Sequence, residues 1–210
     1  MCGRYALTTP ATAVREHFDV VVDDTGGEWP ERLDIRPTQG VPVVWSDAGA
    51  RRLTEMRWGF LPHWYKAPGD GPLIINARAE TVAEKPAFRK AVRERRCLLP
   101  ANGFYEWQAI EGQRKKRVHW LSPPGEALFA FAGIWRGWGE EGLPTVAIVT
   151  CAAPEALVPI HARVPVVVGP ADYALWLGEA GHGAAVLMRP EDGFFEVTPD
   201  RGPGAAPALL

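Results

Sequence analysis

Short apolar stretches that alternate with polar residues, separated by glycine and proline, run through most of this chain. Alternation with a period of two is typical of half-buried β-strands, and the Gly and Pro residues between the stretches mark turns. The pattern predicts strands over residues 4–8, 41–45, 52–58, 73–75, 97–99, 104–108, 117–121, 128–135 and 145–151. The chain is therefore expected to be rich in short strands.

Helical patterns are fewer and shorter. Thr9 is in position to cap a helix that begins at Pro10, because Pro favours the first helical position. Two further helices are predicted, one from Pro86 to about residue 94 and one over residues 171–177. Residues 22–34 are polar, contain glycine and are expected to form a loop. Together with the strands, these elements predict a β-rich α+β fold with a few short helices.

The composition is that of an ordinary globular protein. Of the 210 residues, 47% are hydrophobic and 23% are charged, and no internal repeat or linker divides the chain. A single domain is predicted over residues 1–200, followed by a tail over 201–210 that is rich in Gly, Pro and Ala and is expected to be disordered. The formal net charge is −2 at pH 7, so a nucleic acid would have to be recognised by local clusters of cations.

The cysteines and the terminal segment indicate the compartment. The N-terminus lacks the charged and apolar regions of a secretory signal, and no apolar run approaches the length of a membrane span. Cys2, Cys97 and Cys151 are far apart and form no CxxC pair, which favours neither a structural zinc site nor a disulfide scaffold. We therefore expect a cytoplasmic protein that does not contact a membrane and contains no metal or cofactor.

Cys2 directly follows the initiator Met1. A small second residue favours removal of Met1, which would leave a cysteine with a free α-amine next to its thiol. The α-amine has a pKa near about 7.7–8.0 and a thiol near about 8.5, so both have a usable unprotonated fraction at neutral pH. Such a 1,2-aminothiol captures an aldehyde as a Schiff base and closes into a thiazolidine ring. The alternative is that Cys2 is simply an early residue of the first strand.

Four other residues occur in contexts that suit chemistry. His161 lies in a proline-bounded loop, where it could transfer protons near neutral pH or simply hydrogen-bond within the loop. Glu106 lies among aromatic residues of a predicted strand, where it could be desolvated into a general acid or face the solvent. Asn76 and Arg78 share one side of an extended segment and could bind a sugar oxygen and a phosphate. Alternatively, they could cap a turn and form an ion pair with Glu80.

Two clusters of cations and several tryptophans in turns would suit a single-stranded nucleic acid. One cluster contains Lys85, Arg89, Lys90, Arg93, Arg95 and Arg96, and the other contains Arg114, Lys115, Lys116 and Arg117. Aromatic rings such as those of Trp58 and Trp64 can stack on bases while cations follow the phosphate backbone. The alternative is a solvated helix face and a hairpin tip, with most tryptophans in the core.

Six regions of the chain form a recognisable series. They are MCGRY at 1–5, PTQ at 37–39, WGFLPHW at 58–64, NARAET at 76–81, RCLLP at 96–100 with GFYEW at 103–107, and HARVP at 161–165. In this order, and over residues 1 to about 177, the series resembles the SRAP family, the SOS-response-associated peptidase proteins that sense abasic sites in DNA. The resemblance implies a mixed, partly barrel-like sheet and a monomer.

The resemblance also implies an activity. Cys2 would form a covalent thiazolidine crosslink with the ring-opened aldehyde of an abasic site, preferably in single-stranded DNA, and would shield the lesion. Asn76 would position the opened sugar, Glu106 would transfer protons, and His161 would assist ring opening and reversal of the crosslink. The DNA-binding residues that it implies are Arg4, Pro37, Trp58, Trp64, Arg78 and Arg163. Weak lyase activity and removal of the residue ahead of Cys2 are expected side activities.

The chain departs from the usual family pattern at Asp34, Arg36 and Val164 and over residues 197–200. Asp34 and Arg36 stand where Asn and Ala are more common in the family, and could change how DNA lies in its groove. Two other functions stay open, a cysteine peptidase with Cys2 and His161 as its dyad and a non-catalytic module that binds single-stranded nucleic acid. The basic, aromatic-rich segments favour the sensor of abasic sites.

Overall fold

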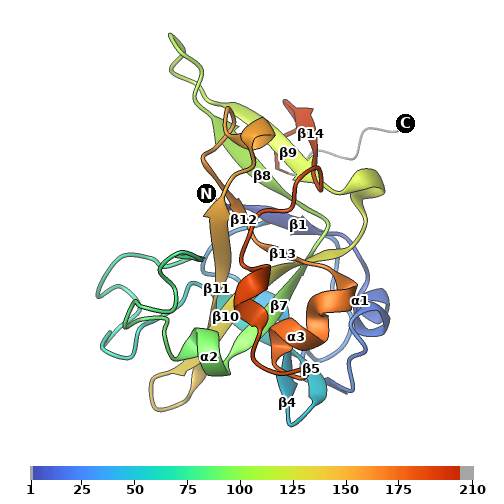
Figure 1. Ribbon diagram of the computed structural model, residues 1–210, viewed down its shortest axis with the longest axis vertical. Helices are drawn as coiled ribbons and strands as arrows, with labels where there is room; N and C mark the ends of the chain where they lie inside the picture. The colour runs from blue at the N-terminus through green and yellow to red at the C-terminus, as the bar shows by residue number, and fades with distance from the viewer. Residues whose placement is uncertain (1, 204–210) are drawn as a thin grey trace.

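The computed structural model describes residues 2–203, which form two β-sheets around a shared apolar core (Figure 1). The smaller sheet has five strands in the order β14–β9–β8–β1–β3, and all of its pairs are antiparallel. Its strands are β1 (Tyr5–Leu7), β3 (Arg32–Ile35), β8 (Gly103–Gln108), β9 (Arg117–Ser122) and β14 (Glu196–Pro199). In Figure 1, β8 and β9 continue into a hairpin that projects from the top of the molecule.

The larger sheet has nine strands and closes into a ring. Its order is β12–β11–β10–β7–β4–β5–β2, and a parallel pairing of β11 with β5 joins the two sides of the series. Because β6 and β2 also pair in parallel while the remaining pairs are antiparallel, the sheet is mixed. Its strands are β2 (Val22–Asp23), β4 (Gly40–Asp47), β5 (Ala50–Trp58), β6 (Asn76–Arg78), β7 (Arg96–Ala101), β10 (Phe129–Trp138), β11 (Leu143–Ala152), β12 (Arg163–Pro165) and β13 (Val167–Val168).

The helices are short. Within residues 2–203 the α-helices are α1 (Ala11–His17), α2 (Ala91–Glu94) and α3 (Tyr173–Leu177). The 3₁₀-helices are η1 (Pro124–Glu126), η2 (Glu155–Leu157), η3 (Pro170–Asp172) and η4 (Ala184–Leu187). Helix α3 is attached to β7, because the indole of Trp176 donates a hydrogen bond of 2.8 Å to the Cys97 carbonyl. The β-rich fold with few short helices is therefore confirmed.

Tyr5 connects the two sheets. Its strand β1 belongs to the smaller sheet, whereas its buried ring packs edge-on against Trp58 and Phe131 of the larger one, with ring centroids 5.2 and 5.8 Å apart. Phe104 of β8 meets Phe131 from the same side at 5.9 Å. Burial of large aromatic rings stabilises this junction strongly. The segment that begins with Cys2 is thus held between the sheets.

Most predicted strands occur within a residue or two of their expected bounds, but the predictions for residues 22–34, 73–75 and 86–94 are wrong. The 22–34 segment contains β2 and β3 rather than only a loop. The strand expected at 73–75 lies at Asn76–Arg78 instead, because that segment pairs with β11 while Ile74 forms only an isolated bridge. The helix expected from Pro86 begins at Ala91, and hydrogen-bonded turns precede it.

Thr9 does not cap α1. The N-cap residue is Pro10, without a side-chain hydrogen bond, and the Thr9 hydroxyl bonds to the Asn102 amide oxygen at 3.1 Å. That oxygen also accepts the backbone N–H groups of Thr8 and Thr9, while the Asn102 nitrogen donates to the Glu126 carbonyl at 2.8 Å. Asn102 is buried, so this residue fixes the point where β1 leads into α1.

Arg201, the first residue of the predicted tail, contacts the rest of the protein. Arg201 forms an ion pair with Glu126 and lies 4.6 Å from the centre of the Trp120 ring, so its side chain is part of the packed structure. The rest of the predicted tail, residues 204–210, lies outside the described residues.

Candidate functional site

Cys2 lies three residues before the start of β1 and is fully buried. Its backbone carbonyl accepts a hydrogen bond from the Asn76 amide nitrogen at 3.0 Å. Asn76 begins β6, which is held in place by its parallel pairing with β11. The fold therefore brings together two of the predicted catalytic residues, which are 74 positions apart in the sequence.

The oxygen of the Asn76 side chain has no hydrogen-bond partner among residues 2–203, although it is buried. Buried amide oxygens are nearly always bonded, and an unused one calls for an explanation. A bound molecule with an N–H or O–H group could supply the missing donor. Asn76 thus combines one bond that holds Cys2 with one acceptor that has no partner among residues 2–203.

Glu106 lies on β8 and is only 4% exposed, so the alternative of a solvent-facing glutamate is wrong. The alternation predicted for this strand is confirmed, because Phe104 packs in the main core whereas Tyr105 and Trp107 pack in a separate cluster on the other side. Side chains two residues apart on a strand share a face. Glu106 therefore lies on the same side of β8 as the core cluster that contains Cys2.

The Cys2 thiol is held in its neutral form. Burial raises the pKa of the Cys2 thiol well above its usual value, and the negative charge of Glu106 raises it further, while a hydrogen bond from the Arg4 backbone has a smaller opposite effect. The raised pKa makes the thiolate fraction smaller than that of an exposed thiol. A reaction at the Cys2 sulfur needs an acceptor for the thiol proton, and Glu106 is the carboxylate whose charge reaches it.

His161 lies in the loop between η2 and β12 and is partly buried. Its Nδ1 lies 3.0 Å from the backbone nitrogen of Arg163 and 3.1 Å from the Arg163 carbonyl, so the loop itself occupies this ring nitrogen. Chemistry on a substrate would have to use Nε2. The loop is tied to the end of β8, because the Gln108 amide donates to the Pro159 carbonyl at 2.9 Å. The strand of Glu106 and the loop of His161 are thereby adjacent.

Arg163 crosses β11, which lies between β6 and β12. Its guanidinium pairs with Glu80 at 2.9 and 3.1 Å and also donates to the carbonyl and hydroxyl of Thr150, at 2.5 and 3.3 Å. The side chain is 16% exposed. Arg163 therefore has partners inside the protein, whereas Arg78 is exposed and forms no ion pair among the described residues. The alternative in which Arg78 pairs with Glu80 is wrong.

The remaining candidates for DNA contact differ in accessibility. Trp64 is 50% exposed, and Pro37 is partly exposed in the turn between β3 and β4. Trp58 is fully buried, and its indole donates to the Ile75 carbonyl at 3.1 Å. Trp58 cannot stack on a base in this structure, so its assignment to DNA binding is corrected to a core residue that supports the segment before Asn76.

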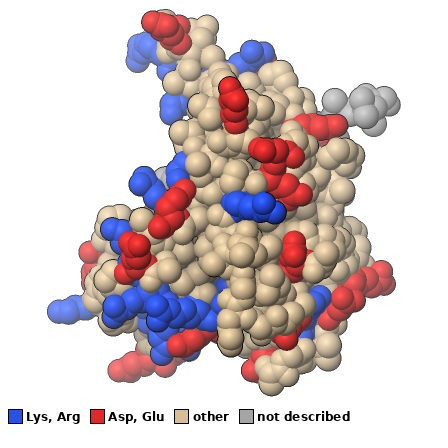
Figure 2. Space-filling model, viewed as in Figure 1, with Lys and Arg blue, Asp and Glu red and all other residues tan. Residues whose placement is uncertain are grey.

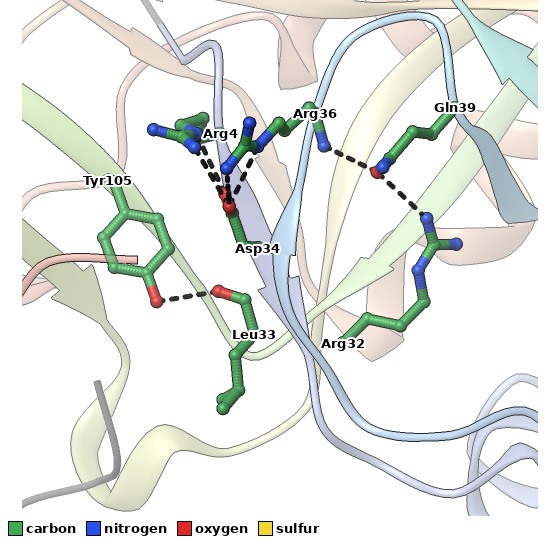
Figure 3. Close-up of polar contacts among 7 residues, drawn as sticks. All are labelled: Arg4, Arg32, Leu33, Asp34, Arg36, Gln39 and Tyr105. Atoms are coloured by element: carbon green, nitrogen blue, oxygen red, sulfur yellow. Dashed lines mark hydrogen bonds and ion pairs between the residues drawn. The ribbon is translucent and has the colours of Figure 1, made fainter. Parts of the chain in front are cut away.

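Arg4 and Arg36 converge on one carboxylate, that of Asp34 (Figure 3). Asp34 lies 2.9 Å from the Arg4 guanidinium and 2.6 Å from that of Arg36. The Arg4 side chain also lies over the Trp107 ring at 5.7 Å. Because two cations share one carboxylate, the cluster keeps a net positive charge, and Arg36 is 59% exposed. This cluster can therefore attract an anion such as a phosphate.

The turn beside this cluster is held by Gln39. Its side-chain oxygen accepts the backbone N–H of Arg36 at 2.9 Å and a guanidinium N–H of Arg32 at 3.2 Å (Figure 3). On the other side, the Tyr105 hydroxyl donates to the Leu33 carbonyl at 2.9 Å and joins β8 to β3. Asp34 and Arg36 depart from the usual family pattern, but their contact was not predicted. Their spacing of two residues on one extended segment places them on the same side and could have indicated it.

Neither a metal cluster nor a membrane span is found in the part of the chain that the structure describes. No group of three or more His, Cys, Asp or Glu side chains there could hold a metal ion. None of the helices between residues 2 and 203 combines the length and the apolar character that crossing a membrane requires.

The family model described as SOS response associated peptidase (SRAP) matches residues 1–199. The chain belongs to the SRAP family. This SRAP chain is 36% identical over 180 residues to "Abasic site processing protein YoaM" of Bacillus subtilis, covering 84% of the chain and 79% of the relative. It is 29% identical over 187 residues to "Abasic site processing protein YedK" of Escherichia coli, with the same coverage of 84% and 79%.

Solved structures show the same fold. A crystal structure of a protein from Bacteroides thetaiotaomicron matches this SRAP chain with a TM-score of 0.79 and 22% identity, covering 95% of the chain and 92% of that protein. A protein from Bordetella bronchiseptica matches with a TM-score of 0.78 and 21% identity, covering 95% and 100% of the two chains. The fold and the family that the sequence predicted are thus confirmed.

Proposed function

We propose that this SRAP protein processes abasic sites in DNA and that Cys2 captures the aldehyde of the opened sugar. The relatives YoaM and YedK are named abasic site processing proteins, which supports the first part. The observation that carries the second part is the position of Cys2, whose backbone carbonyl accepts a hydrogen bond of 3.0 Å from the Asn76 amide and whose thiol is within the field of the Glu106 carboxylate. Aldehyde capture needs these groups, a nucleophile, a hydrogen-bonding amide and a proton carrier.

The reaction begins at the α-amine, which is free only after Met1 is removed. The amine nitrogen of Cys2 adds to the aldehyde carbon, and loss of one water gives a C=N bond. The Cys2 sulfur then adds to the same carbon, so that a C–S bond forms and the thiol proton ends on the nitrogen. The products are a thiazolidine and one water, and no oxidant or reductant is needed. Because the imine is consumed, strand cleavage by elimination remains a weak side activity.

Glu106 serves both steps of this reaction. The neutral thiol must lose its proton as the C–S bond forms, and the Glu106 carboxylate accepts this proton and returns it to the nitrogen. In its protonated form the same group assists the loss of water. The free acceptor of Asn76 orients the amine or a sugar hydroxyl, and His161 transfers protons through Nε2 during opening of the sugar ring. Holding the aldehyde beside the amine makes the step effectively unimolecular.

The surface beside the site suits a single DNA strand. Arg78 is exposed directly after the Asn76 segment, and the Arg4–Asp34–Arg36 cluster supplies further positive charge. The exposed ring of Trp64 offers a face on which a base can stack. Cations would bind the phosphates, which carry no sequence information, so binding should depend little on DNA sequence.

The neutral thiol disfavours a cysteine peptidase. Nucleophilic cysteines of peptidases have a lowered pKa, produced by a nearby cation or base. Here burial and a neighbouring carboxylate raise the pKa of the Cys2 thiol. Aldehyde capture tolerates this because the amine, and not the thiol, reacts first.

The test is a denaturing gel of the protein with single-stranded DNA that carries one abasic site. We expect a heat-stable shifted band for the wild type and for Cys151→Ala, a control that removes another buried cysteine. The band should disappear with Cys2→Ala and with a tetrahydrofuran analogue, which has no aldehyde. A complex that never survives denaturation would overturn the proposal.

Two measurements test the individual roles. Intact-mass analysis should show that active protein has lost Met1, and full activity with Met1 retained would exclude the aminothiol mechanism. Glu106→Ala and His161→Ala should slow crosslink formation or reversal without unfolding the protein. Unchanged rates in both variants would leave Cys2 without the proton-transfer partners that we assign to it.

A further inference from the structure

The arginines of this protein differ in whether they have an acidic partner. Those with an ion pair to Asp or Glu are Arg4, Arg15, Arg36, Arg51, Arg52, Arg117, Arg163 and Arg201. Arg89, Arg95 and Arg136 form no ion pair among residues 2–203, although they line the same pocket. Three cations that have no acidic partner among residues 2–203 therefore line one pocket.

The pocket lies beside α2 and has a volume of about 410 Å³. Besides these three arginines, its lining includes Phe60, His63 and Lys90, and no Asp or Glu lines it. Figure 2 shows Lys and Arg side chains gathered over the region of α2 on this face of the molecule. The chain as a whole has a net charge of −2, so this concentration of positive charge is local.

Aromatic rings hold two of the guanidinium groups. Arg95 lies 5.1 Å from the centre of the Trp135 ring, and Arg136 lies 6.0 Å from that of Phe60. Such contacts orient a guanidinium but leave its charge uncompensated. Burial lowers the pKa of Arg136, and the positive charge of Arg95 lowers it further. Two like charges, partly withdrawn from water, would both be stabilised by an anion between them.

We propose that this pocket binds a phosphate group. A guanidinium presents parallel N–H groups that match two phosphate oxygens, and two arginines that line the same pocket can hold several oxygens of one phosphate. His63 and Lys90 also line the pocket and add donors, and the Lys90 ammonium lies 3.8 Å from the Glu94 carboxylate. A carboxylate ligand would use fewer of these donors, so phosphate fits the set better.

The position of the pocket indicates the source of the phosphate. The backbone N–H of Phe60 donates to the Ile74 carbonyl at 2.7 Å, and Ile74 lies two residues before Asn76. Two residues of extended chain span roughly 7 Å, so the pocket wall and the Cys2 site share one short segment. We assign the phosphate to a DNA strand, an assignment that rests on the proposed function. A free phosphate is the other source of the same chemistry.

Thermal unfolding in inorganic phosphate tests the site itself. The proteins are the wild type, Arg95→Gln, Arg136→Gln and the control Arg189→Gln, whose exposed arginine lies outside the pocket. At equal ionic strength, phosphate in place of chloride should raise the unfolding temperature of the wild type and the control more than that of either pocket variant. Without phosphate, the pocket variants should unfold at the same or a higher temperature, which also shows that they fold. Equal shifts in all four proteins would overturn the proposal.

Binding of undamaged single-stranded DNA tests the source. By fluorescence anisotropy at low salt, each pocket variant should bind about tenfold more weakly than the control. The dependence of log K on log salt should become shallower by about 0.7, the value for one lost phosphate contact. If the pocket variants lose equal affinity for strands with and without a 5′-phosphate, the pocket binds an internucleotide phosphate. If they lose affinity only for the 5′-phosphorylated strand, it binds a terminal phosphate. Pocket variants that bind as tightly as the control would overturn the assignment to DNA.

This experiment is independent of crosslinking. Undamaged DNA has no aldehyde, so Cys2→Ala should bind it like the wild type. A wild type that forms no crosslink but shows the phosphate effects would contradict the proposed function and leave the pocket intact. If the wild type forms the crosslink but the pocket variants bind phosphate and DNA like the control, the pocket proposal is contradicted and the proposed function is not.

Discussion

Replacing Arg163 by Gln tests whether this residue supports the site or contacts DNA. Its guanidinium contacts Glu80 at 2.9 and 3.1 Å and Thr150 at 2.5 and 3.3 Å. The ion pair contributes only about 0.5–1 kcal/mol, because Glu80 is 49% exposed and water screens it. The bonds to buried Thr150 add about 1–2 kcal/mol. We expect Arg163→Gln to lower the free energy of unfolding by about 2 kcal/mol, which lowers the unfolding temperature by roughly 4–8 °C.

Chemical denaturation at several pH values measures this effect and its cause. The hydrogen bond from Arg163 holds the pKa of Glu80 below its usual value. A lowered folded-state pKa gives stabilisation that is present above the usual pKa of Glu, about 4.3, and is lost as the pH falls through the lowered value. The difference between wild type and Arg163→Gln should therefore be constant down to about pH 5 and shrink below about pH 4. Unchanged stability together with a large loss of DNA affinity would refute this reasoning and make Arg163 a DNA contact.

Three further substitutions test the environment of the site. Glu106→Gln should lower the pKa of the Cys2 thiol, because a charge that disfavours the thiolate is removed, and should still slow crosslinking. Thiolate absorbance against pH measures the first effect and the crosslinking rate measures the second. An unchanged pKa would contradict the first. Asn102→Ala should lower the free energy of unfolding by about 3 kcal/mol, because a buried amide loses four hydrogen bonds, and denaturant titration measures this loss. Gly103→Ala should lower the unfolding temperature, because a Cβ at this position would lie 2.3 Å from the Trp120 side chain, and an unchanged temperature would show that the ring can move.

Local sequence patterns were sufficient to predict a strand where polar and apolar residues alternate. The alternation at residues 104–108 predicted both the strand β8 and the face on which Glu106 lies, since neighbouring side chains on a strand point to opposite sides. A continuous apolar run located β11, on which β6 and β12 assemble. These predictions needed no knowledge of distant residues.

Predictions failed where distant pairing decided the structure. The apolar residues 73–75 resemble a strand, but the polar Asn76–Arg78 segment is the one that finds the edge of β11. Trp58 lies before a glycine in a sequence typical of an exposed turn, yet its ring is enclosed by both sheets. The partner of Glu80 was likewise decided by a strand 83 residues away. Information of this kind is held in the tertiary contacts and not in a local window.

The buried, neutral thiol gives the proposed reaction its order. As long as no aldehyde is bound, burial and Glu106 keep the Cys2 sulfur protonated, so it is a poor nucleophile toward other electrophiles. When the amine captures an aldehyde and loses water, the protonated imine places a positive charge next to the sulfur. An adjacent opposite charge lowers the pKa of a thiol, and Glu106 is in position to take the proton. The sulfur therefore becomes reactive only after the imine has formed, which couples ring closure to a bound lesion and limits the lifetime of the intermediate that would cleave the strand.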